Sequence, residues 1–323
     1  PKPSSAASDV YKRQVKRACE IAVSGRHNLL MIGPPGAGKT MIARRIPGIL
    51  PKMTEEEALE VTKIYSVRGL LTESEAWMAE RPFRNPHHTI TPQGLAGGGM
   101  VPGPGEISLA HHGVLFLDEL AEFRRETLEI LRQPMEEHCV KLARLAGNYE
   151  FPSDFMLVAA MNPCRCGYYP DLNRCHCTKG MVEQYLKKIS QPLLDRIDIC
   201  VETKRVEYQD LIKENPHQET SAEIRKRVVA AMERQQQRFA GTNIRYNSRI
   251  PAALLTKYCR LSTKQKQYME SIYQKLELTA RSYHRILRVA RTIADMDGSD
   301  EILTRHLSEA VCYRNVDKKF WEG

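Results

Sequence analysis

Three short apolar runs in the first half of the chain have the length and the flanks of buried β-strands. They cover residues 28–32, 113–117 and 155–161. Each run is almost continuously apolar rather than alternating, which is typical of strands that are buried on both faces of a parallel sheet. The apolar residues stop at the end of each run: Gly33 follows the first, Asp118 the second and Asn162 the third.

Helical periodicity separates these runs. The spacing of apolar residues predicts helices over residues 15–24, 40–49, 54–65 and 126–137. Thr54 is the expected N-cap of the third helix. Residues 140–150 alternate around Gly147-Asn148 and indicate a β-hairpin. Residues 81–105 are rich in Pro and Gly, so we expect an irregular insert or loops between strands there.

After about residue 204 the pattern is helical throughout. We expect helices over residues 220–239, 263–276, 282–296 and 301–314. Strands that alternate with helices predict an α/β fold with a doubly wound parallel sheet, here followed by a smaller all-helical lid. The predicted boundary lies near residues 203–208, which gives an α/β domain over 15–204 and a lid over 205–323. Residues 1–14 are polar and without pattern, and we expect a disordered tail or a foreign segment.

Composition is that of a soluble globular protein. Of the 323 residues, 27% are charged and 42% are hydrophobic, enough for one large or two modest domains. No apolar run approaches the roughly 20 residues of a membrane helix, and no signal-peptide core follows the N-terminus. We therefore expect a cytoplasmic protein without a membrane partner.

The net charge is basic and uneven. It is +9 overall, and residues 210–323 hold 21 Lys and Arg against 14 Asp and Glu. This excess fits a polyanionic partner, and it fits a solvated helical surface equally well.

The first apolar run leads directly into a phosphate-binding loop. The loop reads Gly33-Pro34-Pro35-Gly36-Ala37-Gly38-Lys39-Thr40. Its glycines let backbone N–H groups face phosphate oxygens, and the following helix points its positive end at the same anion. Lys39 is expected on the β- and γ-phosphates of ATP, with the Thr40 hydroxyl on Mg²⁺.

The other two runs supply the remaining groups that hydrolysis needs. The second delivers Asp118 to Mg²⁺ and Glu119 to the attacking water. Asn162, after the third, is a candidate to orient that water or to contact the γ-phosphate. A turn-forming role for Asn162 before Pro163 is the alternative.

Four of the nine cysteines are close together in the sequence. Cys164-x-Cys166 and Cys175-x-Cys177 bracket eight residues. Four thiolates in this pattern are able to hold a structural Zn²⁺, with His176 as a possible substitute for one of them. Free thiols and disulfides are the alternatives. For the pairs His87-His88 and His111-His112 we expect capping or insert contacts instead of metal.

These motifs together resemble the AAA+ ATPases, and most closely the magnesium-chelatase-like ComM/YifB family. The resemblance runs from about Val15 to the C-terminus. It rests on HNLLMIGPPGAGK at 27–39, RPFRNPHHT at 81–89, PGEISLAH at 104–111, GVLFLDEL at 113–120, LVAAMNPC at 157–164 and PLLDRID at 192–198.

The family resemblance implies an assembly and two further arginines. The chain would form a ring, a hexamer, with ATP at the subunit interfaces. Arg196 matches the arginine finger that one subunit gives to its neighbour's ATP. The alternative for Arg196 is a local ion pair with Asp195 or Asp198. Arg281 resembles the sensor-2 arginine of the lid, with Arg285 as the other candidate.

The resemblance also implies a role on DNA, as a branch-migration-type helicase in recombination or transformation. About 80 residues separate Lys39 from Asp118, which leaves room for an insert at residues 84–101. The segment 140–144 is similar to the pore hairpin of minichromosome-maintenance helicases. Lys141 and Arg144 would then contact DNA phosphates.

Two other functions remain open. One is a chelatase-like ATPase that remodels a protein partner, and the other is an assembly switch that rarely hydrolyses ATP, against which Glu119 argues. Full-length members of the family carry an N-terminal domain similar to that of Lon proteases. We find no such domain here, so we expect a fragment or a truncated variant.

Overall fold

The computed structural model describes residues 5–72, 77–144, 147–205 and 219–321, without the side chains of residues 5–12, 144, 317 and 318. The chain divides into two compact units. The sheet unit comprises residues 30–47 and 51–196, and the helical unit comprises the residues up to 29, residues 48–50 and the residues from 197 onward. Part of the boundary expected at 203–208 lies outside the described residues.

The apolar runs form a five-stranded parallel sheet, which confirms the predicted α/β class. Its order is β2-β5-β8-β1-β9. The strands are β1 (Leu29–Ile32), β2 (Phe83–Arg84), β5 (Val114–Leu117), β8 (Met156–Met161) and β9 (Ile199–Glu202). Every residue of β1, β5 and β8 is buried, as expected for a sheet that is covered on both faces. β5 pairs in parallel with β8, and Val114 lies level with Met156.

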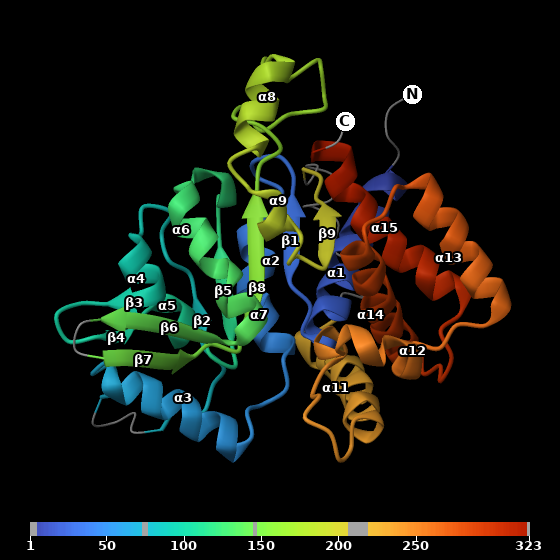
Figure 1. Ribbon diagram of the computed structural model, residues 1–323. Coiled ribbons are helices and arrows are strands. Elements are labelled where there is room, and N and C mark those ends of the chain that lie inside the picture. Colours follow the sequence, from blue (N-terminus) through green and yellow to red (C-terminus); the bar gives the residue numbers. More distant parts are fainter. Residues whose placement is uncertain (1–4, 73–76, 145–146, 206–218, 322–323) are drawn as a thin grey trace. The chain divides into compact units, whose positions relative to one another are not determined.

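Short helices connect the strands of the sheet unit (Figure 1). They are α2 (Lys39–Arg45), α3 (Glu55–Val67), α4 (Pro92–Ala96), α5 (Glu106–Leu109), α6 (Arg125–Glu129), α7 (Pro134–Glu137), α8 (Lys179–Leu186) and α9 (Gln191–Leu194), with 3₁₀ turns η1 (Ile46–Ile49), η2 (Leu120–Glu122) and η3 (Ile130–Arg132). Thr54 caps α3 as predicted. Its side chain accepts a hydrogen bond from Glu57 N at 3.2 Å, and the Glu57 carboxylate accepts one from Thr54 N.

Two predicted helices are shorter than expected. The predicted helix over 126–137 is broken into α6, η3 and α7, because Pro134 lacks an N–H and its ring would clash with the preceding turn of a continuous helix. The predicted helix over 40–49 is α-helical only to Arg45. It continues as the 3₁₀ turn η1, which contains Pro47 and Gly48.

The predicted hairpin is present, but the predicted turn is wrong. Strands β6 (Cys139–Arg144) and β7 (Gly147–Pro152) pair so that Arg144 lies opposite Gly147. Gly147 is therefore a strand residue and not part of the turn, and residues 145–146 lie outside the described residues. A second, small hairpin of β3 (Gly97–Gly98) and β4 (Gly103–Pro104) lies in the expected insert. It carries the exposed side chains of Met100 and Val101.

The helical unit contains the predicted C-terminal helices and one short helix, α12 (Leu255–Tyr258), that was not predicted. Its helices are α1 (Ser5–Gly25), α11 (Ser221–Arg238), α12 (Leu255–Tyr258), α13 (Thr263–Lys275), α14 (Ala280–Met296) and α15 (Thr304–Trp321), with 3₁₀ turns η4 (Asn247–Arg249) and η5 (Ala252–Leu254). The prediction of a patternless tail over 1–14 is wrong from Ser5 onward. Ala6 and Ala7 favour a helix, and the last proline of the tail is Pro3. Among the described residues no helix is long and apolar enough to span a membrane.

Candidate nucleotide-binding site

The carboxyl ends of β1, β5 and β8 bring the predicted site residues together. The first loop residue, Gly33, donates from its N–H to Met161 O at 3.1 Å, which joins the phosphate loop to the end of β8. Thr40 Oγ1 donates to Asp118 Oδ2 at 2.6 Å, and Lys39 Nζ donates to Asn162 Oδ1 at 3.1 Å. Residues from three separate motifs therefore meet at one edge of the sheet.

The glycines of the loop are required by backbone conformation. Gly36 and Gly38 have φ values of 76° and 77°, in the left-handed region that side chains disfavour. A methyl group at Gly36 would meet nothing within 4 Å, so space is not the constraint there. The loop backbone is thus open at Gly36 and lies beside the N-terminus of α2, where an anion site of this kind is expected.

Lys39 is buried and held by oxygen atoms. Besides Asn162, its Nζ donates to Gly33 O at 2.6 Å and to Pro34 O at 2.9 Å. Burial lowers the pKa of Lys39 to about 8, and the charges of Asp118 and Glu119 limit this decrease. A phosphate anion beside the ammonium group would favour its charged form.

Glu119 has a strained backbone and a partner that the sequence did not predict. Its φ of 52° and ψ of 46° are left-handed, and its N–H donates to Asp118 Oδ1 at 2.9 Å. Such conformations in residues other than glycine are concentrated at functional sites. Its carboxylate is largely exposed and lies 3.3 Å from His88 Nδ1. We had expected only capping or insert contacts for His88.

The residues of this edge fit Mg²⁺ and ATP. Hydroxyl and carboxylate oxygens are the ligands that Mg²⁺ prefers. The Thr40 hydroxyl and the Asp118 carboxylate are one of each, and they lie 2.6 Å apart. Lys39 and the loop N–H groups would hold the phosphates. Mg²⁺, when bound, would neutralise phosphate charge and orient the phosphoryl group.

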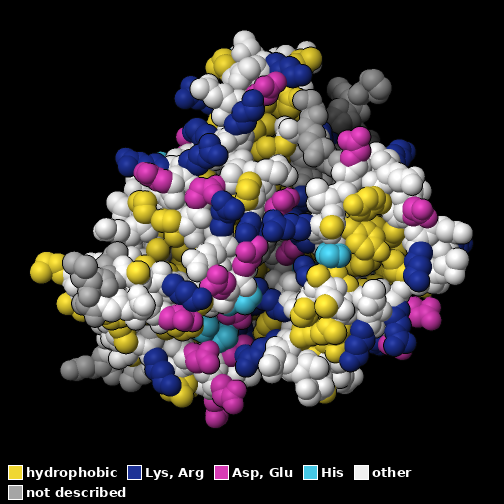
Figure 2. Space-filling model, in the orientation of Figure 1, with side chains coloured by type: hydrophobic (Ala, Val, Ile, Leu, Met, Phe, Trp, Pro, Cys, Tyr) yellow, Lys and Arg dark blue, Asp and Glu magenta, His cyan; other side chains and the backbone are white. Residues whose placement is uncertain are grey.

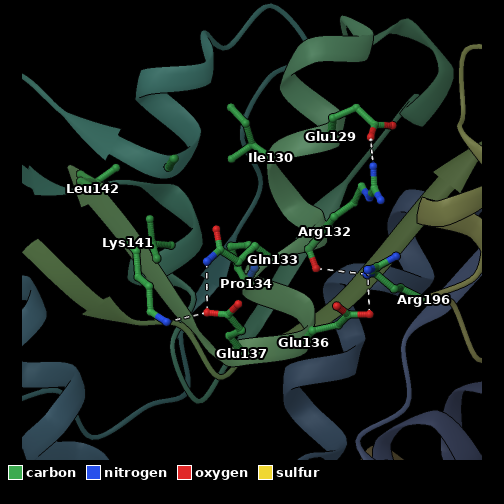
Figure 3. Close-up of a pocket in the computed structure, with 12 residues that line it drawn as sticks. Glu129, Ile130, Arg132, Gln133, Pro134, Glu136, Glu137, Lys141, Leu142 and Arg196 are labelled. Carbon is green, nitrogen blue, oxygen red and sulfur yellow. Dashed lines mark hydrogen bonds and ion pairs between the residues drawn. The ribbon is translucent and has the colours of Figure 1, made fainter.

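Arg196 lines a cavity of about 570 Å³ on the sheet unit (Figure 3). Its guanidinium pairs with Glu136 at 2.7 Å and donates to Arg132 O at 3.1 Å and to Pro192 O at 2.5 Å. Its side chain is only 12% exposed. The arginine that we predicted as a finger is thus held within its own subunit, with Glu136 as its ion-pair partner.

Lys141 lies in β6 and lines the same cavity. Its Nζ pairs with Glu137 at 2.7 Å, and 53% of the side chain is exposed. The hydrogen bond and charge of Glu137 raise the pKa of Lys141. Arg144 ends the same strand, but its side chain is outside the described part of the structure.

The two candidate lid arginines differ in environment. Arg281 is exposed in the first turn of α14. Arg285 is buried and donates to Ile197 O at 3.1 Å. It also lies near the partly buried Asp198, whose Oδ2 accepts from Asn28 N at 3.1 Å. Burial acts to raise the pKa of Asp198, but His27 and Arg285 lower it overall. Arg285 therefore contributes to the interior of the helical unit.

The four clustered cysteines converge in the loop after β8. Their sulfur atoms all lie within 4.8 Å of one another, and Cys164, Cys166 and Cys175 are 3.4 to 3.8 Å apart. The side chain of His176, the alternative ligand, is exposed. Burial acts to raise the pKa of Cys166, but the Tyr168 N–H and the neighbouring thiols lower it to about 6. We call the loop 164–177 the cysteine knuckle.

His111 and His112 converge on Glu60. The Asp154 N–H donates to His111 Nδ1 at 2.9 Å, which leaves the proton of a neutral ring on Nε2, 3.0 Å from Glu60 Oε2. His112 Nε2 lies 2.7 Å from the same oxygen. Burial lowers the pKa of His111 and so favours this neutral form. Because metal-binding histidines usually donate from the nitrogen that faces away from the metal, His111 is unsuited as a ligand.

The sheet, the loop and the helical unit together define a phosphate-loop domain of the AAA+ class followed by a helical domain. The chain belongs to the magnesium chelatase family. The family described as "Magnesium chelatase, subunit ChlI" matches residues 8–211, and "Magnesium chelatase, subunit ChlI C-terminal" matches residues 218–314.

Similar proteins confirm the predicted ComM/YifB family. The chain is 44% identical over 309 residues to "Uncharacterized protein YifB" of Salmonella typhimurium, which is 96% of this chain and 60% of that protein. It is 42% identical over 305 residues to "Competence protein ComM" of Haemophilus influenzae, 94% of this chain and 59% of that one. The chain thus spans about three fifths of the length of these curated relatives.

The arrangement around Lys39 predicts its contribution to nucleotide binding. Lys39→Ala should weaken the binding of a fluorescent ATP analogue by about thirty-fold or more, because truncating one partner of a buried charge contact costs about 2–5 kcal/mol. The exposed Lys63 provides the control, and Lys63→Ala should bind as the parent does. Equal affinity of both variants would contradict the proposed site.

Proposed function

We propose that the chain binds ATP and Mg²⁺ at the carboxyl edge of its sheet and hydrolyses the ATP. The observation that carries this proposal is the pairing of Lys39 with Asn162 and of Thr40 with Asp118 at that edge. Lys39 and the loop N–H groups hold the phosphates, and Thr40 and Asp118 hold the metal. Glu119 accepts a proton from the attacking water, and Asn162 orients that water.

We propose that the chain works as a ring, a hexamer, with one nucleotide site at each subunit interface. Membership of the family supports this assembly. In the ring, Arg196 would exchange Glu136 for the phosphates of a neighbour's ATP, a role worth about 10³–10⁵ in rate in well-studied cases. For the sensor-2 role we favour Arg281, because its side chain is exposed whereas Arg285 is committed to the helical unit.

We propose DNA as the substrate on which the motor acts, in the cytoplasm, by branch migration during recombination or transformation. One relative is named a competence protein, and the helical unit carries the basic excess. The hairpin of β6 and β7 contains the segment 140–144, which resembles the pore hairpin of minichromosome-maintenance helicases. Lys141 and Arg144 on β6 would contact DNA phosphates without reading the sequence of the DNA.

A protein partner is the second candidate. The family description refers to a chelatase subunit, which supports a role in remodelling another protein. Figure 2 shows side chains of Asp and Glu beside those of Lys and Arg on the face in view. Mixed charge of this kind suits a protein surface as well as DNA.

The effect of DNA on the ATPase rate distinguishes the two. If DNA is the substrate, forked or four-way DNA should raise the ATPase rate several-fold at low salt, and the effect should fade as salt is added. Lys141→Ala should reduce the stimulation and lower the salt slope by about one.

Lys187 provides a matched control. Like Lys141, it is an exposed lysine in an i,i+4 pair with glutamate. Lys187→Ala should leave the stimulation unchanged. An ATPase rate indifferent to every DNA structure would exclude the DNA role and favour the protein partner.

We propose that the cysteine knuckle holds a structural Zn²⁺. Four sulfurs about 2.3 Å from zinc in a tetrahedron are about 3.8 Å apart, close to the 3.4 to 3.8 Å found among Cys164, Cys166 and Cys175, and the sulfur of Cys177 lies within 4.8 Å of these three. Four protein ligands leave no open position, so the metal would stabilise the loop and take no part in catalysis.

Elemental analysis of the purified chain tests this proposal. We expect about one zinc per chain, and near zero in the double variant Cys175→Ser/Cys177→Ser. Cys312→Ser, at an exposed cysteine outside the knuckle, should keep its zinc. A parent chain with no zinc and four reactive knuckle thiols would contradict the proposal.

A further inference from the structure

The cysteine knuckle lies directly against the phosphate loop. Its first ligand, Cys164, follows Asn162 by two residues at the end of β8, and its last residues lead into α8. Figure 1 shows α8 beyond the carboxyl end of β8, on the side of the sheet where the nucleotide edge lies. A methyl group placed on Gly167, in the middle of the knuckle, would be 2.4 Å from Pro35 Cδ and 2.9 Å from Pro35 Cγ. The Gly167 backbone therefore packs on the ring of Pro35.

Gly167 is held by the backbone of the knuckle, between its cysteines. Its N–H donates to Cys164 O at 3.0 Å, and it directly follows Cys166. The next turn of chain is held by the Tyr169 N–H, which donates to Cys164 Sγ at 3.4 Å. Gly167 has a φ of 85°, so it occupies a conformation available mainly to glycine. A metal that fixes Cys164 and Cys166 would fix the position of Gly167 as well.

On the other side of this contact are the groups that hold Lys39. Pro35 lies between Pro34, whose carbonyl accepts from Lys39 Nζ, and the left-handed Gly36. The same methyl group on Gly167 would lie 3.8 Å from Asn162 Cγ, and the Asn162 side chain also accepts a hydrogen bond from Lys39 Nζ. Gly167 therefore lies beside two neighbours of the phosphate-binding lysine: the ring of Pro35, which follows the Pro34 carbonyl, and the side chain of Asn162.

We infer that the metal-loaded cysteine knuckle is a brace for the phosphate loop, so that the affinity for ATP depends on the metal through the contact of Gly167 with Pro35. Without the metal, the knuckle loses its fixed shape, and the phosphate loop loses the contact of Pro35 with Gly167. The nucleotide site then has to be ordered when ATP binds, and this ordering reduces the observed affinity. This inference rests on the proposed ATP and zinc sites and adds a coupling between them.

The direct test is Gly167→Ala. Its methyl group forces Pro35 to move but leaves all four thiols in place, so the variant should keep about one zinc per chain. Its affinity for a fluorescent ATP analogue, measured in excess Mg²⁺, should fall about tenfold. Gly241→Ala is the matched control, because Gly241 has a similar φ of 75° and a methyl group there would meet nothing within 4 Å. Gly241→Ala should bind ATP as the parent does.

The second measurement removes the metal. A zinc-selective chelator should weaken ATP binding by the parent chain about tenfold, and added zinc should restore it. In Gly167→Ala the brace is already displaced, so the same treatment should change the affinity less than about twofold. This non-additivity is the signature of coupling through one contact. Circular dichroism after chelation checks that the rest of the chain stays folded.

The outcomes separate the inference from the proposed function. If the parent binds ATP and contains zinc, but chelation or Gly167→Ala leaves the affinity unchanged, the coupling is wrong and the ATP site stands. Equal losses on chelation in the parent and in Gly167→Ala would also overturn it, since the effect would then bypass Pro35. A parent that binds no ATP, or no zinc, contradicts the proposed function itself.

Discussion

The parallel register of three buried strands is the constraint on which the site depends. Because β5 and β8 run in the same direction with Val114 level with Met156, both strands end at one edge of the sheet. The phosphate loop follows β1 at the same edge. Each fully buried aliphatic side chain in these strands contributes about 1.5–3 kcal/mol, so the edge is rigid. Polar groups attached to such an edge need little additional ordering to converge on a phosphate and a metal.

The sequence predicted the features that are encoded locally. The strands, the glycine loop and the Thr54 cap each depend on residues that are adjacent in the chain, and the structure contains them. Lys39, Thr40, Asp118 and Asn162 converge because each follows a strand of the same parallel sheet, and the carboxyl ends of parallel strands lie at one edge. The misses are of two kinds. The first kind is local: the helix breaks at Pro134, and Gly147 belongs to strand β7 and not to the turn of the hairpin.

Contacts between distant segments make up the second kind of miss. These contacts are His88 with Glu119, Arg196 with Glu136, and Gly167 with Pro35. The two residues of each pair are at least 31 positions apart in the chain. The spacing of residues along the sequence does not predict such contacts. They matter here because Arg196 and Lys141, the cations proposed to act on a neighbour's ATP and on DNA, are both paired with glutamates of their own subunit. Their proposed roles therefore require an exchange of partners, which links activity to assembly and to the substrate.

The central claim is that the carboxyl edge of this sheet hydrolyses ATP with Glu119 as the base. Glu119→Gln tests it most directly, since the amide keeps the size of the side chain and loses the ability to accept a proton. We predict ATP affinity within about twofold of the parent and a hydrolysis rate lower by about 10²–10⁴. Glu122→Gln, at a partly exposed glutamate that pairs with Lys188, should hydrolyse ATP at the parent rate. Undiminished hydrolysis by Glu119→Gln would contradict the account.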